Sequence, residues 1–185
     1  MKIFDAFKAK VQTRDIPKTA RGQFNAVARK EKGDTKKIAE RLGISRRQVQ
    51  RILKGDRKIE NSRPETLANL EKQVRRDHQP RIRAKGEAEA KARGMYVHTR
   101  AQFGFQSAAG STDDARYRRL TEDVPDHLIP ELFEAARAGD EDRLRELIGN
   151  GLAEEYFHSP ETPGTAREEL LVEFGDIDYI EIEYR

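Results

Sequence analysis

The sequence predicts an α+β protein: an N-terminal all-α domain and a smaller α+β domain with an antiparallel sheet. Apolar residues recur at the helical period through the first half and alternate around residues 96–105 and near the C-terminus. Charge divides in the same way. Residues 1–94 hold 27 Lys and Arg against 12 Asp and Glu, whereas residues 95–185 hold 9 against 21. The split indicates a half that faces a polyanion and a half with another task.

Three parts are expected along the chain. Residues 1–60 are expected to form a helix-turn-helix DNA-binding domain, residues 61–94 a basic helical linker, and residues 95–185 an acidic α+β domain for priming or interaction. The first helix is predicted in KIFDAFKAKV, with one apolar face made by Ile3, Phe4, Phe7 and Val11. Pro17 then restricts the residue before it and starts a second helix, expected to run to Lys30.

The stretch TKKIAERLGISRRQVQRILKG, which begins at Thr35, is the most specific signal in the sequence. Gly43 stands where a tight turn between two helices needs a positive φ, and Ser45 is a good N-cap for the second helix. Val49, Ile52 and Leu53 give that helix an apolar face. The pattern predicts a helix-turn-helix.

The second helix of this pair carries polar and basic side chains on its other face. Arginine can fork onto guanine and glutamine can pair with adenine in the major groove, so DNA binding is predicted. The alternative is a solvated basic face on a helical bundle. The expected DNA contacts are Ser45, Arg46, Arg47, Gln48, Gln50, Arg51 and Lys54.

Residues 61–94 continue the basic character. A helix starts near Pro64, Pro80 interrupts it, and the following stretch RIRAKGEAEAKARG has little apolar surface beyond Ile82. A helix this polar is expected to lie against DNA or to bridge to the second half, and otherwise to be an exposed linker. Phosphate contacts are expected from Arg75, Arg76, Arg81 and Arg83.

The second half mixes strands and helices. MYVHTRAQFGF favours a strand, GSTDDARYRRLTE reads as the start of a helix, and two more helices are expected within residues 127–157. EELLVEF and IDYIEIEY flank Gly175-Asp176, a dipeptide suited to a two-residue hairpin. The acids that alternate along the last segment are expected to form a solvated outer face: Asp176, Asp178, Glu181 and Glu183.

Composition excludes several functions. The chain has no cysteine, so it has no disulfides, thiolate metal sites or cysteine catalysis. Its four histidines lack metal-ligand spacing, and no apolar run approaches the roughly 18 residues of a membrane span. With no signal peptide at its start, the protein is expected to be soluble and cytoplasmic. It is not expected to be an enzyme or to hold a metal or cofactor of its own.

One short segment carries a candidate nucleophile. In GSTDDAR, Ser111 or Thr112 would cap the expected helix, and Asp113 and Asp114 would meet the positive end of its dipole. If Ser111 is the cap, the Thr112 hydroxyl is free. The two carboxylates would then help to hold a divalent ion against an incoming nucleotide, with a polymerase supplying the rest of the site.

Four stretches resemble the telomere terminal proteins (Tpg) of linear actinomycete replicons: DAFKAKVQTRDIPKTARGQFNAV, the helix-turn-helix, GSTDDAR and DIDYIEIEY. The similarity spans nearly the whole chain in the same order. It implies a protein that protects telomeres and is joined to the 5′ end of linear DNA through a threonine hydroxyl. That hydroxyl primes a DNA polymerase, which brings Mg²⁺ and fills the recessed end. The resemblance also implies a telomere-associated partner that binds the terminal single strand and recruits the protein.

The position that best matches the family's linking threonine is Thr112, with Ser111, Thr99 and Thr121 as alternatives. Such a protein would lie with the nucleoid at the replicon ends. The second hypothesis is a helix-turn-helix transcription regulator whose acidic half dimerises or binds a ligand. A third is a nucleotidyltransferase that uses the acids of the second half. The oligomeric state stays open.

Overall fold

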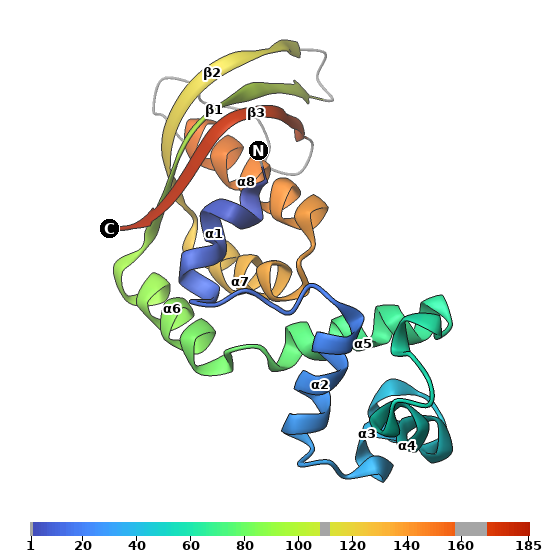
Figure 1. Cartoon of the computed structure of the whole chain (residues 1–185). Helices are drawn as coiled ribbons and strands as arrows, with labels where there is room; N and C mark the ends of the chain where they lie inside the picture. The colour runs from blue at the N-terminus through green and yellow to red at the C-terminus, as the bar shows by residue number, and fades with distance from the viewer. Residues whose placement is uncertain (1, 108–111, 158–169) are drawn as a thin grey trace. The chain divides into compact units, whose positions relative to one another are not determined.

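The computed structural model describes residues 2–107, 112–157 and 170–185 (Figure 1). Over these residues the chain is α+β, with eight helices, mostly N-terminal, and a three-stranded antiparallel sheet. It forms two compact units: Arg14–Pro80, and Met1–Thr13 together with Arg81–Arg185. These units divide the chain elsewhere than at the expected residues 60 and 94, because the first helix and residues 81–94 belong with the sheet.

The unit of residues 14–80 is all-helical. Its elements are α2 (Ala20–Lys30), α3 (Thr35–Leu42), α4 (Arg46–Lys54), the 3₁₀ turn η1 (Ile59–Asn61) and α5 (Pro64–Asp77). Helix α2 begins later than the expected Pro17, because the Thr19 side chain accepts a hydrogen bond from the Gly22 N–H at 3.1 Å and caps the helix. The core is a single cluster that includes Phe24, Ile38, Leu42, Val49, Ile52, Ile59 and Leu70.

A partly buried arginine ties the helices of this unit together. Arg41 of α3 donates to Glu31 at 2.6 Å and to Gln73 of α5 at 2.9 Å, and it pairs with Asp77. Burial alone would lower the pKa of Arg41, but the hydrogen bonds that its guanidinium donates to Asp77 and Glu31 outweigh burial and raise that pKa. The guanidinium therefore stays charged and fixes α3 against α5.

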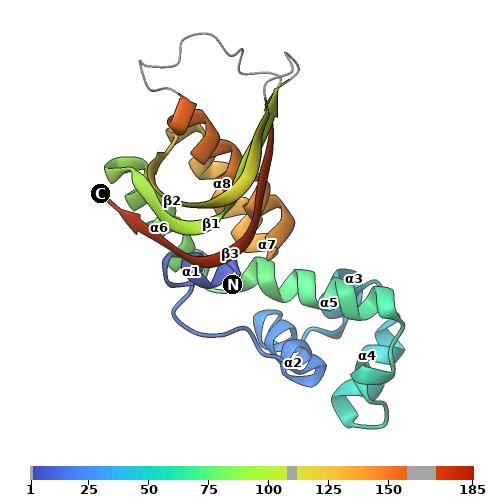
Figure 2. The same ribbon diagram turned by 90° about the horizontal axis from the view of Figure 1, so that it is seen from above.

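The second unit contains the sheet. Its elements are α1 (Ile3–Val11), α6 (Pro80–Arg93), β1 (Met95–Ser107), β2 (Thr112–Val124), the 3₁₀ turn η2 (Asp126–Leu128), α7 (Ile129–Ala138), α8 (Glu141–Phe157) and β3 (Leu170–Tyr184). The strand order is β2-β1-β3, with both pairs antiparallel. Figure 2 shows the curved sheet with α7 and α8 on its inner side. Gly139 ends α7 in the left-handed conformation, with φ 71°, before α8 begins.

Strand β2 replaces a predicted helix. The segment from Thr112 was expected to start a helix, but it pairs with β1 from Gln106↔Thr112 to Met95↔Val124. The central strand β1 needs a partner on both edges to satisfy its backbone N–H and C=O groups, and that requirement outweighs a local capping signal. Leu120 is buried between exposed Arg119 and Thr121, and Glu122 and Val124 on the same face as Leu120 are half-buried and buried, which is the period of a strand.

The predicted C-terminal hairpin is also wrong. Residues on both sides of Gly175-Asp176 pair with β1, so β3 runs unbroken instead of folding back on itself. Gln102 pairs with Gly175 and Arg100 with Tyr179, so three residues of β3 oppose Ala101 alone. This bulge places Asp176 at φ 39°. The turn-forming dipeptide therefore marks a kink within a strand.

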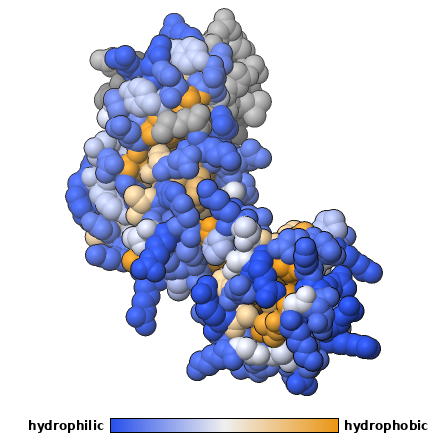
Figure 3. Space-filling view, viewed as in Figure 1, coloured by the Kyte–Doolittle hydropathy of each residue, from blue (hydrophilic) through white to orange (hydrophobic). Residues whose placement is uncertain are grey.

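The four alternating acids of β3 are exposed, as expected for a solvated face. Figure 3 shows a largely hydrophilic surface in its view. Among the described residues, Leu53 and Tyr117 are the exposed large hydrophobic side chains, at 39% and 49%. Leu53 was expected on the apolar face of its helix but lies at its edge. No helix in the described ranges is long and apolar enough to span a membrane.

Helix α6 is held by backbone contact despite its polar sequence. Gly86 and Ala90 are buried, and a Cβ atom added to Gly86 would lie 2.2 Å from the carbonyl oxygen of Lys10 in α1. The Tyr184 hydroxyl donates to the Gly86 carbonyl at 3.2 Å. The Lys10 ammonium lies 4.8 Å from the centre of the Tyr184 ring. The helix expected to lie on DNA or to bridge to the second half therefore packs beside α1 and the end of β3.

Candidate nucleic-acid interface

Three local interactions fix the start of α3, its end and the start of α4. Asp34 caps α3 by accepting from the Lys37 and Lys36 N–H groups, and these bonds lower the pKa of its carboxyl. Gly43 closes α3 at φ 67°, the conformation that glycine adopts without penalty. Ser45 then caps α4, because its side chain accepts from the Gln48 N–H at 3.2 Å.

Gln48 completes a capping box and is only half-exposed. Its side-chain oxygen accepts from the Ser45 N–H at 2.9 Å, so this end of the amide is occupied within the protein. The sequence analysis placed both residues among the DNA contacts. The structure gives them a first task, which is to set the start of α4.

The remaining predicted residues of α4 lie on one exposed face of the helix. Arg46 donates to the Thr35 hydroxyl at 2.9 Å, which orients its guanidinium along α3. The side chains of Arg47, Arg51 and Lys54 make no hydrogen bond or ion pair with any residue in the described ranges. Gln50 is exposed beside them. The face is therefore cationic and free to meet a ligand.

The predicted phosphate contacts are divided between the two units. Arg75 and Arg76 lie on α5 in the same unit, where Arg75 donates to Glu71 at 2.7 Å. Arg81 and Arg83 lie on α6, which belongs to the other unit. Arg83 is half-buried, and burial, followed by the charge of Arg137, lowers its pKa. Its role in that unit is partly structural.

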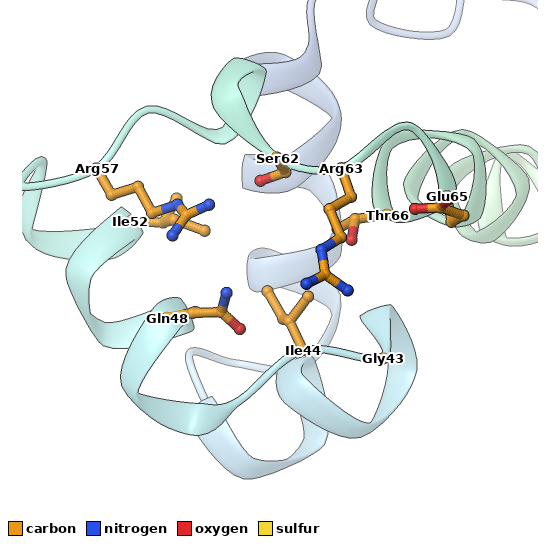
Figure 4. A pocket seen from close by; sticks show the side chains of 9 residues that line it. All are labelled: Gly43, Ile44, Gln48, Ile52, Arg57, Ser62, Arg63, Glu65 and Thr66. Atoms are coloured by element: carbon orange, nitrogen blue, oxygen red, sulfur yellow. The ribbon is translucent and has the colours of Figure 1, made fainter.

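A pocket of about 450 Å³ lies along one side of α4, and sequence reasoning missed it (Figure 4). Its lining comes from the α3–α4 turn, α4, and the segment that leads into α5. Two arginines face it, Arg57 and Arg63, neither of which was predicted as a contact. The available signal was the clustering of basic residues in GDRKIENSRPE directly after the second helix of the pair.

The candidate nucleophile lies in a strand. Thr112 is the first residue of β2, opposite Gln106, and Asp113 is opposite Phe105. Thr112 therefore does not occupy the first turn of a helix, and no helix dipole meets Asp113 and Asp114 there. Ser111 lies outside the described residues, and the side chains at 112–114 are outside them too. The segment joins β1 to β2 at one end of the sheet.

Two other hydroxyls were alternatives to Thr112. Thr99 is fully buried and donates to the Tyr179 carbonyl at 2.8 Å, which leaves no surface for a nucleotide. Thr121 is exposed and shares a hydrogen bond with His98 Nδ1, while His98 Nε2 lies 2.8 Å from the Tyr179 hydroxyl. This arrangement of hydroxyl, imidazole and orienting phenol is one in which a base can take a proton.

Among the residues the structure describes, no three His, Cys, Asp or Glu side chains form a group that could hold a metal ion. His127 lies 3.5 Å from Glu154, and His158 is outside the described ranges. Comparison with models of protein families, with curated proteins and with solved structures gave no match to this chain. The function therefore has to be argued from the residues and their geometry.

Proposed function

We propose that this chain is a DNA-binding terminal protein that is joined to the 5′ ends of linear DNA, primes end-patching synthesis and protects telomeres. In this proposal, α3, the turn at Gly43 and α4 are a helix-turn-helix, and α4 enters the major groove. A DNA polymerase and a telomere-associated recruiting protein are its partners, within the cytoplasm at the replicon ends. It is a polymerase substrate and not a catalyst.

The exposed cationic face of α4 is the observation that carries the DNA-binding half of this proposal. Residues 14–80 hold 19 Lys and Arg against 9 Asp and Glu, a net charge of +10. Side chains that are cationic, exposed and unpaired suit DNA, because they need not break internal ion pairs before they meet phosphates or base edges. The resemblance to telomere terminal proteins supports the covalent half.

The covalent step takes place on a side-chain hydroxyl, which we assign to Thr112. Its oxygen forms a bond to the α-phosphorus of a deoxynucleoside triphosphate while the bond to pyrophosphate breaks. The hydroxyl proton passes to a base of the polymerase or to solvent, and Mg²⁺ brought by the polymerase neutralises the phosphates. Thr112 is the first residue of β2.

Incorporation of a labelled nucleotide onto the protein tests this assignment. With polymerase and Mg²⁺ present, the wild type is expected to become labelled, and the Thr112→Val variant is expected to lose at least about 99% of the label because the nucleophile is gone. Thr121→Val is the matched control, since it removes an exposed hydroxyl of the same sheet.

The possible outcomes separate the parts of the proposal. Full labelling of Thr112→Val with loss in Thr121→Val would move the link to the hydroxyl beside His98. An unlabelled wild type would refute priming. The rival, a helix-turn-helix regulator, binds duplex DNA reversibly, so its complex falls apart in SDS and heat. The terminal protein stays on the DNA until a nuclease releases it.

A further inference from the structure

The pocket beside α4 is built to receive an anion. In Figure 4 the guanidinium groups of Arg57 and Arg63 reach into it from opposite sides, from the segment after α4 and from the residue before α5. Ser62 and Gln48 add polar groups, and Ile44 and Ile52 form its apolar floor. Glu65 is the one carboxylate of the lining. Two cations against one anion leave the pocket net positive.

Neither guanidinium makes a strong hydrogen bond or ion pair within the described part of the protein. The Arg63 side chain makes no hydrogen bond or ion pair with the described residues. Arg57 donates one bond to the Asn61 carbonyl at 3.4 Å, which is long for a hydrogen bond. Arginine presents five donors in a planar fork, so most of the hydrogen-bonding capacity of this pair remains unused. A phosphate oxygen matches such a fork.

The location of the pocket suggests where that phosphate comes from. Gln48 and Ile52 line the pocket and belong to α4, one helical turn apart. Arg51 lies next along the circumference, between this side of the helix and the exposed face. A helix about 10–12 Å across fills a major groove about 12 Å wide, so sugar–phosphate backbones pass along its sides.

We infer that Arg57 and Arg63 clamp one backbone phosphate of the duplex whose major groove α4 enters. The inference rests on the proposed DNA binding and adds a site to it. The clamp fixes the depth and the direction of α4 in the groove, while the exposed face of α4 meets the base edges. Such a contact positions the protein and carries no sequence information itself.

Binding of the full-length chain to a fluorescein-labelled, mixed-sequence duplex about two helical turns long tests the clamp by anisotropy. Arg63→Gln and Arg57→Gln are each expected to raise Kd about tenfold, because a charge-assisted contact is lost. Each is also expected to flatten the slope of log K against log salt by about 1. Lys58→Gln is the matched control, since it removes an exposed cation beside Arg57 that does not line the pocket.

Neutral methylphosphonates placed one at a time along the duplex identify the contacted phosphate. At one phosphate position, in one strand or in both, the neutral linkage should weaken DNA binding by the wild type. At that position it should cause no further loss of affinity in Arg63→Gln. If the affinity losses from the neutral linkage and from Arg63→Gln are additive at every phosphate position, the clamp is refuted. So would affinities of both arginine variants equal to that of Lys58→Gln.

Two further outcomes are distinct. If inorganic phosphate at millimolar concentration binds to the pocket arginines but both variants keep the DNA affinity of the wild type, the pocket binds a small anion and the backbone clamp is refuted. If the wild type binds no duplex at all, the proposed DNA binding fails first. Unchanged melting temperatures of both variants show that the effects come from binding; we expect them to be unchanged for Arg63→Gln, because the exposed Arg63 side chain makes no hydrogen bond or ion pair with the described residues.

Discussion

Glu122 points toward the helices from the inner face of the sheet. It pairs across β2 and β1 with buried Val97, and α8 brings Glu155 near it. Partial burial, followed by repulsion from Glu155, raises the pKa of the Glu122 carboxyl. The folded state therefore holds a proton here more tightly than the unfolded chain does. At neutral pH the charged Glu122 carboxylate therefore destabilises the folded state.

Glu122→Gln is expected to stabilise the protein near pH 7 by less than about 1 kcal/mol. A raised carboxyl pKa makes wild-type stability fall as the pH rises past the ordinary value of about 4.3, and the loss is complete above the raised value. The advantage of the variant should therefore disappear below about pH 4. Urea unfolding at several pH values measures this, with the exposed Glu181→Gln as control. A variant less stable than wild type at pH 7 would contradict it.

Single residues were predictable where their own backbone dictates the role. Gly43 needs a left-handed conformation and Ser45 is a cap, and both follow from local chemistry. The use of Gln48 was harder to foresee, because a glutamine three residues after a cap suits both a capping box and a base contact. Arg57 and Arg63 were not predicted, because they lie outside the second helix of the pair and line the same pocket only in the folded unit.

Elements meet most closely where α6 passes α1. Gly86 lets the two backbones touch, and the same site receives the Tyr184 hydroxyl. Gly86→Ala is expected to destabilise the unit of the sheet by about 1–3 kcal/mol, since the new methyl group meets a backbone oxygen that has no room to move. Thermal unfolding tests this, with Ala88→Ser on the exposed face of α6 as control. A glycine-to-alanine gain in stability, as in an ordinary helix, would show that the contact is loose.

At the level of elements, the helices with periodic apolar faces and the strand character of β1 and β3 were predictable, whereas β2 and the continuity of β3 were not. The α1, α3, α4, α7 and α8 segments each carry their own apolar stripe and end signals. In contrast, the conformations of β2 and β3 depend on pairing with the two edges of β1, and β3 is distant from β1 in sequence. The local features at Thr112 and Gly175 pointed to a helix start and a hairpin turn. Neither feature contains information about the central strand.

The charge of the whole molecule follows its two units. Residues 14–80 carry a net +10, and the remaining residues, with 17 Lys and Arg against 24 Asp and Glu, carry −7. The sequence predicted a basic and an acidic part, and α6, which was expected within a basic linker, belongs to the unit that contains the sheet. A unit this basic is suited to a polyanion whatever its exact contacts.

DNA affinity of the full chain is expected to depend steeply on salt. If the basic unit engages about 6–10 phosphates, affinity should fall by roughly 10³–10⁵ between 50 and 200 mM salt. Replacing both Arg47 and Arg51 with glutamine should reduce the slope, since fewer counterions are released on binding. A titration by anisotropy measures both. An affinity that does not respond to salt would rule out the basic unit as the DNA-binding surface.

The helical unit interrupts the unit that contains the sheet, and this has a consequence for synthesis on the ribosome. Residues 14–80 have all of their core partners within a short span and can collapse as soon as they emerge. The apolar side of α1 packs against α7, α8 and β3, all of which are synthesised later than the helical unit. Until then Ile3 and Phe7 stay exposed to solvent, although the helical unit that follows them in the chain has already folded. Synthesis must therefore have passed β3 before α1 can complete its packing.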